Sequence, residues 1–370
     1  MFLFPSSFFC QASLFLVMNQ ALPVQDFQQR FVKAASSGFS RWDKDGDGFI
    51  GLRESTRAIA DKTNRGDEAA AVATLHEILR RTDWPVNAIS LEQVRDSVRR
   101  PSAFPPTDPP WELRFSTMAA AVNAPKGQLF GPGAPKIDGI RQGREGDCYL
   151  IASVGAMAER NPDRIRAFFK ELPNNRFEIQ FKGAIIQVEE LTDAERALAA
   201  TSGNQGSWMS LLEKGWGVAL QKIRRESFGN ALDRAGGGGD PALVIRYLTG
   251  RKTISRQILL EDGAAEILRD LDYSLRSAME EKRLVCATTD RRALPQGLVP
   301  THAYAVLGYD PKTRLVTVWN PWGIDFEPAP GIGFKGGYET RKGRFNVALS
   351  DFIKIFDTVI LESASRVGED

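Results

Sequence analysis

The stretch QGREGDCYLIAS, Gln142 to Ser153, places a cysteine where an irregular loop gives way to a periodic segment. After Gly146 and Asp147, apolar residues share one helical face, which predicts a helix beginning at or near Cys148. At a helix N-terminus the macrodipole and unpaired backbone N–H groups favour the thiolate, the nucleophilic form of cysteine. The Gln142 amide and the backbone N–H of Cys148 can then donate hydrogen bonds to an oxyanion beside the thiol. Taken alone, the motif fits equally well a cysteine whose side chain has only a packing role.

A thiolate needs a base, and the chain has two histidines, His76 and His302. His76 falls in a helical segment and is interpreted as a helix-face residue. His302 opens THAYAVLGYD, whose alternation predicts a strand that turns at DPKT and returns as RLVTVWNPWG. This hairpin carries Asn320 towards His302, where it can orient the imidazole, and Trp322 can shield that bond from water. The competing interpretation is a strand histidine with satisfied hydrogen bonds and no catalytic role. The order of Cys148, His302 and Asn320 in the chain favours a Cys-His-Asn site.

A second motif, DKDGDGFIGLRE, matches the twelve-residue calcium-binding loop of an EF-hand. Asp43, Asp45 and Asp47 supply side-chain oxygens at positions one, three and five. The backbone carbonyl of Phe49 supplies position seven, and Glu54 closes the loop as a bidentate ligand. The alternative, an acidic turn in solvent, requires all of these positions to coincide by chance.

EF-hands usually occur in pairs, and a helix-loop-helix pattern follows directly. Aligning Ile89 with Ile50 places Thr82, Trp84 and Gln93 at positions one, three and twelve, where the carboxylates are missing. The second loop is therefore predicted to support the first through a short β-bridge without binding metal.

Composition predicts a soluble globular chain of two or more domains, because 42% of the 370 residues are hydrophobic and 25% are charged. Stretches rich in Pro and Gly, RPSAFPPTDPP and GPGAPK, mark the boundary between them. The predicted divisions are 1–22, a signal peptide or a wrongly assigned start; 23–100, an EF-hand domain; 101–127, a Pro-rich linker; 128–361, a catalytic domain split into 128–250 and 251–361; and 362–370, a tail.

Other features exclude several classes of function. The net charge of +2 without a long basic run argues against binding nucleic acid or a polybasic membrane surface. Cys10, Cys148 and Cys286 are odd in number and far apart, so neither a disulfide framework nor a zinc site is expected. Cys286 lies in a strand pattern and is interpreted as a buried residue. Gly236 to Gly239 is interpreted as a flexible loop. No membrane span of the mature chain and no partner subunit are predicted, and the location is cytoplasmic or secreted according to whether the apolar N-terminus is a signal.

These motifs together resemble the calpains, which are calcium-dependent, papain-like cysteine proteases. QGREGDCYLIAS is similar to their cysteine motif, THAYAVLGY to their histidine motif and WNPWG to their asparagine motif. Weaker similarity in WMSLLEKGWG, GGGGDPALVIRYLTG and GRFNVALSDFIKIFDTVIL extends the resemblance over about 128–361.

The resemblance implies an α+β fold, with a papain-like core of two subdomains preceded here by a small all-α EF-hand domain. It implies Cys148 as nucleophile, His302 as base, Asn320 as the orienting group and Gln142 in the oxyanion hole. Calcium is the implied cofactor, and proteins or peptides are the implied substrates. Calcium dependence would then belong either to the protease core or to the N-terminal loop.

Two positions depart from the family pattern, and two other functions stay open. Glu145 stands where an apolar residue is usual and Tyr149 where Trp is frequent; the carboxylate either raises the thiol pKa or points to water. The leading prediction is a calcium-dependent cysteine endopeptidase. The alternatives are a catalytically silent calcium-binding interaction protein, and a papain-like amidase or transglutaminase, in which an Asp is expected in place of Asn320.

Overall fold

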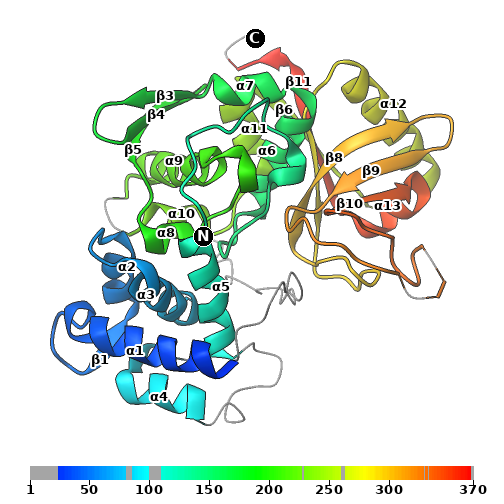
Figure 1. Cartoon of the computed structure of the whole chain (residues 1–370). Helices are drawn as coiled ribbons and strands as arrows, with labels where there is room; N and C mark the ends of the chain where they lie inside the picture. Colours follow the sequence, from blue (N-terminus) through cyan, green and yellow to red (C-terminus); the bar gives the residue numbers. More distant parts are fainter. Residues whose placement is uncertain are drawn as a thin grey trace. The chain divides into compact units, whose positions relative to one another are not determined.

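The chain forms two compact units in the computed structural model, and each unit is assembled from several stretches of sequence (Figure 1). The first unit contains the residues up to Lys126 together with Leu191–Ala199 and Arg225–Arg234; the second contains the remainder. The predicted signal peptide, and Thr82 and Trp84 of the second loop, lie outside the described residues. Those described are 24–80, 86–99, 110–226, 229–259, 263–328, 330–331 and 333–367.

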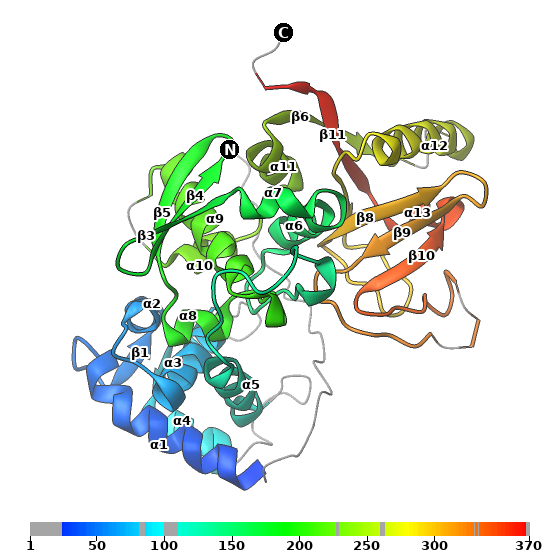
Figure 2. The same ribbon diagram turned by 45° about the horizontal axis from the view of Figure 1, so that its top comes forward.

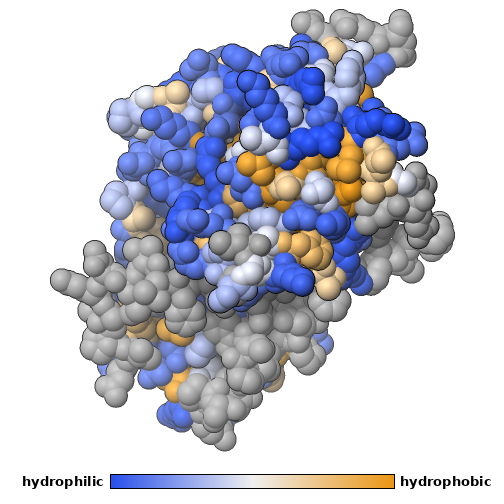
Figure 3. Space-filling model, turned by 90° about the vertical axis from the view of Figure 1, so that its right-hand side faces the viewer, coloured by the Kyte–Doolittle hydropathy of each residue, from blue (hydrophilic) through white to orange (hydrophobic). Residues whose placement is uncertain are grey.

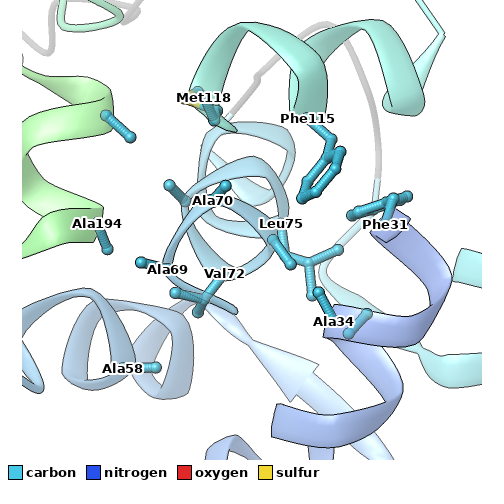
Figure 4. Packing of buried hydrophobic residues seen from close by; sticks show 14 of the residues in the cluster. Phe31, Ala34, Ala58, Ala69, Ala70, Val72, Leu75, Phe115, Met118 and Ala194 are labelled. Atoms are coloured by element: carbon cyan, nitrogen blue, oxygen red, sulfur yellow. The ribbon is translucent and has the colours of Figure 1, made fainter. Parts of the chain in front are cut away.

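The first unit is helical apart from one short pair of strands. Its central helix, α3, is Ala-rich and buried over most of its length, which is typical of a helix enclosed by others. Leu75 of α3 lies beside Phe31 and Phe115, while Ala69 faces Ala194 (Figure 4). Its helices are α1 (Val24–Trp42), α2 (Leu52–Ala60), α3 (Gly66–Leu79), α4 (Leu91–Arg99), α5 (Trp111–Asn123), α8 (Asp193–Leu198) and most of α10 (Ala231–Ala235).

Two stretches from the predicted catalytic domain complete this unit. The Thr192 hydroxyl, next to α8, donates to the carbonyl of Ile59 on α2 at 2.6 Å. The Asn230 amide, next to α10, donates to Glu195 on α8 at 3.0 Å. Helix α5, within the predicted linker, packs against α3 through residues such as Phe115.

The two short strands of the first unit are β1 (Phe49–Gly51) and β2 (Ala88–Ser90), which pair antiparallel. Ile50 lies opposite Ile89, so the predicted pairing of these residues is confirmed. Both side chains are fully buried, which fixes the register because a shift by one residue would turn them outward.

The second unit has two lobes, of which the first is mainly helical (Figure 2). The helix predicted to begin at Cys148 is confirmed, and its apolar face is buried. The lobe contains α6 (Cys148–Arg160), α7 (Pro162–Arg166), α9 (Trp208–Arg224) and α11 (Pro241–Thr249), with a sheet of β3 (Phe169–Leu172), β4 (Arg176–Phe181) and β5 (Ala184–Glu189).

The second lobe is built on a six-stranded antiparallel sheet in the order β10-β9-β8-β7-β11-β6. Tyr304 and Val306 of β8 pack with helices α12 and α13. Cys286 of β7 is fully buried as predicted, and its sulfur lies 3.6 Å from the Ser153 hydroxyl of α6. The elements are β6 (Arg251–Gln257), α12 (Ala264–Glu280), β7 (Val285–Thr289), β8 (His302–Asp310), β9 (Leu315–Trp319), β10 (Arg344–Ala348), α13 (Leu349–Ile355) and β11 (Thr358–Arg366).

Separate regions of helices and antiparallel strands make this an α+β protein, and the predicted hairpin after His302 is confirmed as β8 and β9. Hydrophobic residues gather in one area on the face of the sheet lobe (Figure 3). None of the described helices is both long and apolar enough to cross a bilayer.

Candidate active site

Cys148 is the first residue of α6, and its side chain is partly exposed. The carbonyl of Asp147 accepts the backbone N–H of Leu150 at 2.8 Å and that of Ile151 at 3.1 Å. The first turn of the helix therefore forms directly behind the loop. The thiol lies at the helix end whose backbone N–H groups have no partner within the helix.

His302 begins β8 and Asn320 directly follows β9, so the hairpin holds their side chains together. Nε2 of His302 lies 3.0 Å from Oδ1 of Asn320, and the backbone N–H of Trp322 donates to the same oxygen at 3.0 Å. Because that oxygen only accepts, Nε2 carries the proton and Nδ1 keeps its lone pair. The ring centroids of His302 and Trp322 are 5.1 Å apart, and His302 and Asn320 are only 6% and 4% exposed, so this bond is shielded from water.

The cysteine helix packs against the strand that carries His302. The backbone N–H of Ala303 hydrogen-bonds the Cys148 sulfur in its ionised form. The backbone N–H of Gln142 donates to the carbonyl of Pro321 at 2.9 Å, so the loop before α6 also contacts the turn after Asn320. The residues that the structure brings together in the second unit are Gln142, Cys148, His302, Asn320 and Trp322.

Burial determines the charges of the thiol and the imidazole. It raises the pKa of Cys148 to about 12, opposed by the N–H of Ala303 and assisted by the Asp147 charge. It lowers the pKa of His302 to about 4, although the hydrogen bond to Asn320 opposes this. Burial therefore favours a thiol and a neutral imidazole over the charged pair. The helix-end argument expected a thiolate, but an attraction of about 0.3–1 kcal/mol does not offset the cost of removing a charge from water.

Three carboxyl groups are buried beside the nucleophile helix. Glu145 and Asp147 come from the cysteine loop and Glu213 from α9. Burial raises the pKa of Glu213 well above its ordinary value, and the charges of Asp147 and Glu145 raise it further. These effects favour the protonated form of Glu213, and its carboxyl oxygen accepts the backbone N–H of Ala200 at 2.6 Å. Of the two possibilities left open for Glu145, the structure excludes a side chain pointing to water. Sequence analysis assigned no role to Glu213.

The side-chain amide of Gln142 is held by its own loop. Its Nε2 donates to the carbonyl of Glu145 at 2.7 Å. An amide N–H₂ group has two hydrogens, so the second is left for another acceptor. The arrangement fixes the amide on the loop that leads to Cys148.

Tyr149 anchors the start of α6, a role that the sequence did not reveal. Its hydroxyl donates to the carbonyl of Ala235 at 2.9 Å and accepts from the Trp216 indole at 3.0 Å. Gly239, in the stretch interpreted as a flexible loop, packs against the Tyr149 ring, since a Cβ there would lie 2.6 Å from ring carbons. The run of glycines was the available signal, because close backbone approach is one reason for such residues.

The predicted calcium loop joins α1 to α2 in the first unit. Among the described residues, Asp43, Asp45 and Asp47 form a cluster whose carboxylate oxygens lie within 4.8 Å of one another. Oδ2 of Asp43 accepts the N–H of Gly48 at 3.0 Å, and the positive φ of Gly48, +85°, allows the sharp turn. Clustered oxygen donors of this kind fit a hard cation such as Ca²⁺.

Glu54, the predicted bidentate ligand, bonds to the backbone of the loop. Its Oε1 accepts the N–H of Lys44 at 2.6 Å, and its Oε2 accepts the N–H of Gly51 at 2.9 Å. Phe49, the predicted carbonyl ligand, begins β1. Each oxygen of the Glu54 carboxylate has a second lone pair, so Glu54 could bind a cation while it keeps these two backbone hydrogen bonds.

His76 lies on helix α3, in agreement with its interpretation as a helix-face residue, and its side chain is fully buried. The reason is that α3 is enclosed on all sides. Its Nδ1 lies 2.9 Å from the Ser55 hydroxyl of α2, and its Nε2 lies 2.8 Å from Oδ1 of Asp233 on α10. Ser55 is also fully buried and contacts the carbonyl of Leu52. This Ser-His-Asp set cannot receive a substrate, and it joins three helices instead.

Comparison with known proteins identifies the class to which this site belongs. Residues 113–329, more than half of the chain, match the family model described as calpain family cysteine protease. The chain belongs to the calpain family.

One similar protein is calpain-13 of Rattus norvegicus. It is 26% identical over 254 residues, which covers 60% of this chain and 35% of the relative. The chain thus spans about a third of the length of this relative.

Proposed function

We propose that the chain is a calcium-dependent cysteine endopeptidase, with Cys148 as nucleophile and His302 as general base. The observation that carries the proposal is the 3.0 Å contact between Nε2 of His302 and Oδ1 of Asn320. This contact fixes the tautomer in which Nδ1 can take a proton. The thiol of Cys148, at the start of a helix packed against the His302 strand, is the proton's source.

In the proposed reaction, Nδ1 of His302 takes the thiol proton as the sulfur of Cys148 attacks the peptide carbonyl carbon. The backbone N–H of Cys148 and the second amide hydrogen of Gln142 bind the resulting oxyanion. The imidazolium then protonates the leaving amine, the C–N bond breaks and a thioester remains. Water, deprotonated by His302, hydrolyses the thioester and restores the thiol.

The pKa values specify where the protein must assist this reaction. With a thiol pKa of about 12 and an imidazole pKa of about 4, proton transfer from Cys148 to His302 is unfavourable before substrate binds. The positive charge on His302 and the negative charge on the substrate oxygen must therefore form in the same step as the interactions that stabilise them. Asn320 stabilises the imidazolium, and the oxyanion donors stabilise the substrate oxygen. This requirement gives Gln142 a role limited to the transition state.

Cleavage of casein by the full chain, with calcium or with EGTA, tests the proposal. Cys148→Ser should be inactive, and Cys286→Ala, which changes a fully buried thiol of β7, should retain activity. Cleavage by Cys148→Ser would refute the nucleophile. Equal wild-type activity in calcium and EGTA would refute calcium dependence while leaving the protease assignment intact.

We propose that calcium binds the loop Asp43–Glu54, supported by the three clustered carboxylates and the turn at Gly48. Titration calorimetry of the full chain should detect this site. Glu54→Gln should weaken binding sharply because the bidentate carboxylate is lost, whereas Glu92→Gln on the exposed face of α4 should not. Equal affinity in Glu54→Gln and the wild type would place the calcium elsewhere.

A catalytically silent calcium-binding protein is the second candidate. The observation in its favour is the charge of Asp147 beside the thiol, which opposes formation of the thiolate. In that case casein would stay intact under all conditions while the calorimetric signal persisted. An amidase or transglutaminase would instead act on small amides or join peptides without cleaving casein.

A further inference from the structure

We propose that Asp147 and Glu213 share one proton in a buried hydrogen bond, and that this carboxyl pair positions Cys148. The inference rests on the proposed cysteine protease function and adds two residues to it. Both are positioning residues, because they act through the loop and the helix that carry the thiol. The shared proton itself can be tested without any proteolysis.

Asp147 joins the nucleophile helix to the loop before it. Its carbonyl accepts the backbone N–H groups of Leu150 and Ile151, at 2.8 and 3.1 Å, in the first turn of α6. Its side chain is completely buried, although the residue is an aspartate. A contact that holds this side chain therefore also holds the first turn of α6, where Cys148 directly follows Asp147.

Glu213 lies in the middle of α9 and is also completely buried. Its Oε2 accepts the backbone N–H of Ala200 at 2.6 Å, and its Oε1 meets no N–H donor among the described residues. The carboxyl group of Glu213 hydrogen-bonds the side chain of Asp147. The two side chains thus join α9 to the start of α6 within the second compact unit.

A hydrogen bond between two carboxyl groups requires a proton. Ionised carboxylates accept hydrogen bonds but donate none, so two of them in contact only repel each other. One proton turns one group into a donor and leaves the pair with one negative charge instead of two. Burial favours this state, because each additional charge is expensive to remove from water. Such a pair titrates as a unit, so the proton belongs to both residues.

The groups around Glu213 favour retention of the proton. Burial raises the pKa of Glu213 well above its ordinary value of 4.5, and the charges of Asp147 and Glu145 raise it further, although the backbone N–H that it accepts opposes the shift. Strand β5 packs against α9. The buried residues of β5 are apolar, and its carboxylate, Glu189, is exposed. The charges that act on the pair therefore come from the cysteine loop.

The shared proton matters because the thiol lies next to Asp147. Burial and the charge of Asp147 both raise the pKa of Cys148, which is about 12. Loss of the shared proton would add a second negative charge to the pair and make its two carboxylates repel each other. The added charge disfavours the thiolate, and the repulsion displaces the residue that precedes α6. Cys148 is therefore expected to react efficiently only while the pair holds its proton.

Infrared difference spectroscopy of the full chain tests the proton directly. The wild type at neutral pH should show the C=O stretching band of a protonated carboxyl group, and the band should disappear at alkaline pH. Glu213→Gln should lack this band, because its amide supplies a permanent N–H to Asp147 and still accepts the N–H of Ala200. Glu171→Gln, which changes an exposed carboxylate of β3 in the same unit, should keep it. A wild type without the band, or a band that persists in Glu213→Gln, would overturn the shared proton.

Urea denaturation provides a second measurement of the proton. Because the pKa of Glu213 is raised in the folded chain, its contribution to the free energy of unfolding is fully present below pH 4.5 and is lost as pH rises through the folded value. The urea midpoint of the wild type should therefore fall relative to that of Glu213→Gln as pH rises above 4.5. A difference between the two midpoints that stays constant with pH would contradict the proposal.

Peptide hydrolysis tests the positioning role. In the wild type, kcat/KM should fall by about tenfold for each pH unit above the apparent pKa of the pair, because the protonated fraction falls by that factor. Glu213→Gln should remain active at neutral pH and lack this decline. Glu213→Leu, which removes the hydrogen bond to Asp147, should lose activity at neutral pH, so recovery by the amide distinguishes hydrogen bonding from packing. Asp147→Asn supplies the amide from the other side if Glu213→Gln does not fold.

The outcomes separate this inference from the proposed function. An equal alkaline decline in the wild type and in folded Glu213→Gln, with the infrared band present in the wild type, would overturn the positioning role alone. A wild type that shows the band but cleaves no peptide would overturn the proposed protease function and the positioning role with it, while the shared proton would stand.

Discussion

The substitution Asn320→Ala tests the central contact of the site. It removes one oxygen that accepts from both Nε2 of His302 and the backbone N–H of Trp322, each at 3.0 Å. A buried donor left without a partner costs about 1–3 kcal/mol. The same contact selects the imidazole tautomer, so its loss should lower kcat by about 5- to 150-fold, the rate equivalent of that energy. The free energy of unfolding should fall by about 1–3 kcal/mol for each donor that water does not reach.

The assay compares kcat and KM for a fluorogenic peptide in saturating calcium, together with urea denaturation. The decrease should appear in kcat, because Asn320 acts on the base and not on substrate binding. Asn346→Ala is the matched control, since Asn346 lies exposed on the neighbouring strand β10, where its side-chain oxygen accepts the Thr317 hydroxyl at 2.8 Å. It should change neither quantity appreciably.

Asn320→Asp distinguishes orientation from charge. A carboxylate still accepts both hydrogen bonds, but its charge raises the pKa of His302 and favours the imidazolium. The acidic limb of kcat/KM should therefore move to higher pH. A value of kcat within twofold of the wild type in Asn320→Ala, with a folded protein, would refute the assigned role of the contact.

Three further predictions use the same preparations. Iodoacetamide or E-64 should modify Cys148 well before Cys286, because Cys286 is fully buried. Peptide mass spectrometry measures the order in which the two cysteines react. Equal rates would contradict the assignment of Cys148 as the nucleophile. Gln142→Ala should lower kcat for the peptide substrate by about 10²- to 10³-fold with little change in KM. A change confined to KM would instead make Gln142 a substrate-positioning residue. Burial lowers the pKa of His302 from an ordinary 6.5 to about 4 in the folded chain. Its contribution to the free energy of unfolding is therefore fully present above pH 6.5, and about 3 kcal/mol is lost as pH falls from 6.5 to 4. Urea midpoints of the wild type and of His302→Gln should converge towards pH 4, and parallel curves would refute the burial argument.

Local pattern was sufficient to predict several parts of this fold. The helix starting at Cys148, the hairpin that begins at His302 and the pairing of Ile50 with Ile89 all follow from residues close in sequence. In each case periodicity and turn residues act on the same short stretch of chain. The proximity of Asn320 to His302 followed from the hairpin alone.

The parts that sequence did not reveal depend on contacts between distant segments. His76 and Asp233 are separated by 157 positions, and neither lies in a pattern that indicates the other. The pKa of Cys148 could not be predicted either, because it depends on burial that the whole second unit creates. The helix-end argument was correct about position and wrong about which electrostatic effect is larger. Glu213 could not be recognised from the sequence for the same reason, since only the burial of its carboxyl group makes it unusual.

The tight packing between α6 and the sheet limits how far the nucleophile helix can move. A Cβ on Gly155 would lie 2.5 Å from the Trp319 ring, so helix and strand are already at closest approach. At the end of α6, Arg344 of β10 makes two hydrogen bonds to Glu159, at 3.1 and 2.7 Å. The far end of the helix is thus fixed to the sheet, while its first turn is held by Tyr149. The position of Cys148 relative to the sheet is therefore set by contacts at both ends of α6.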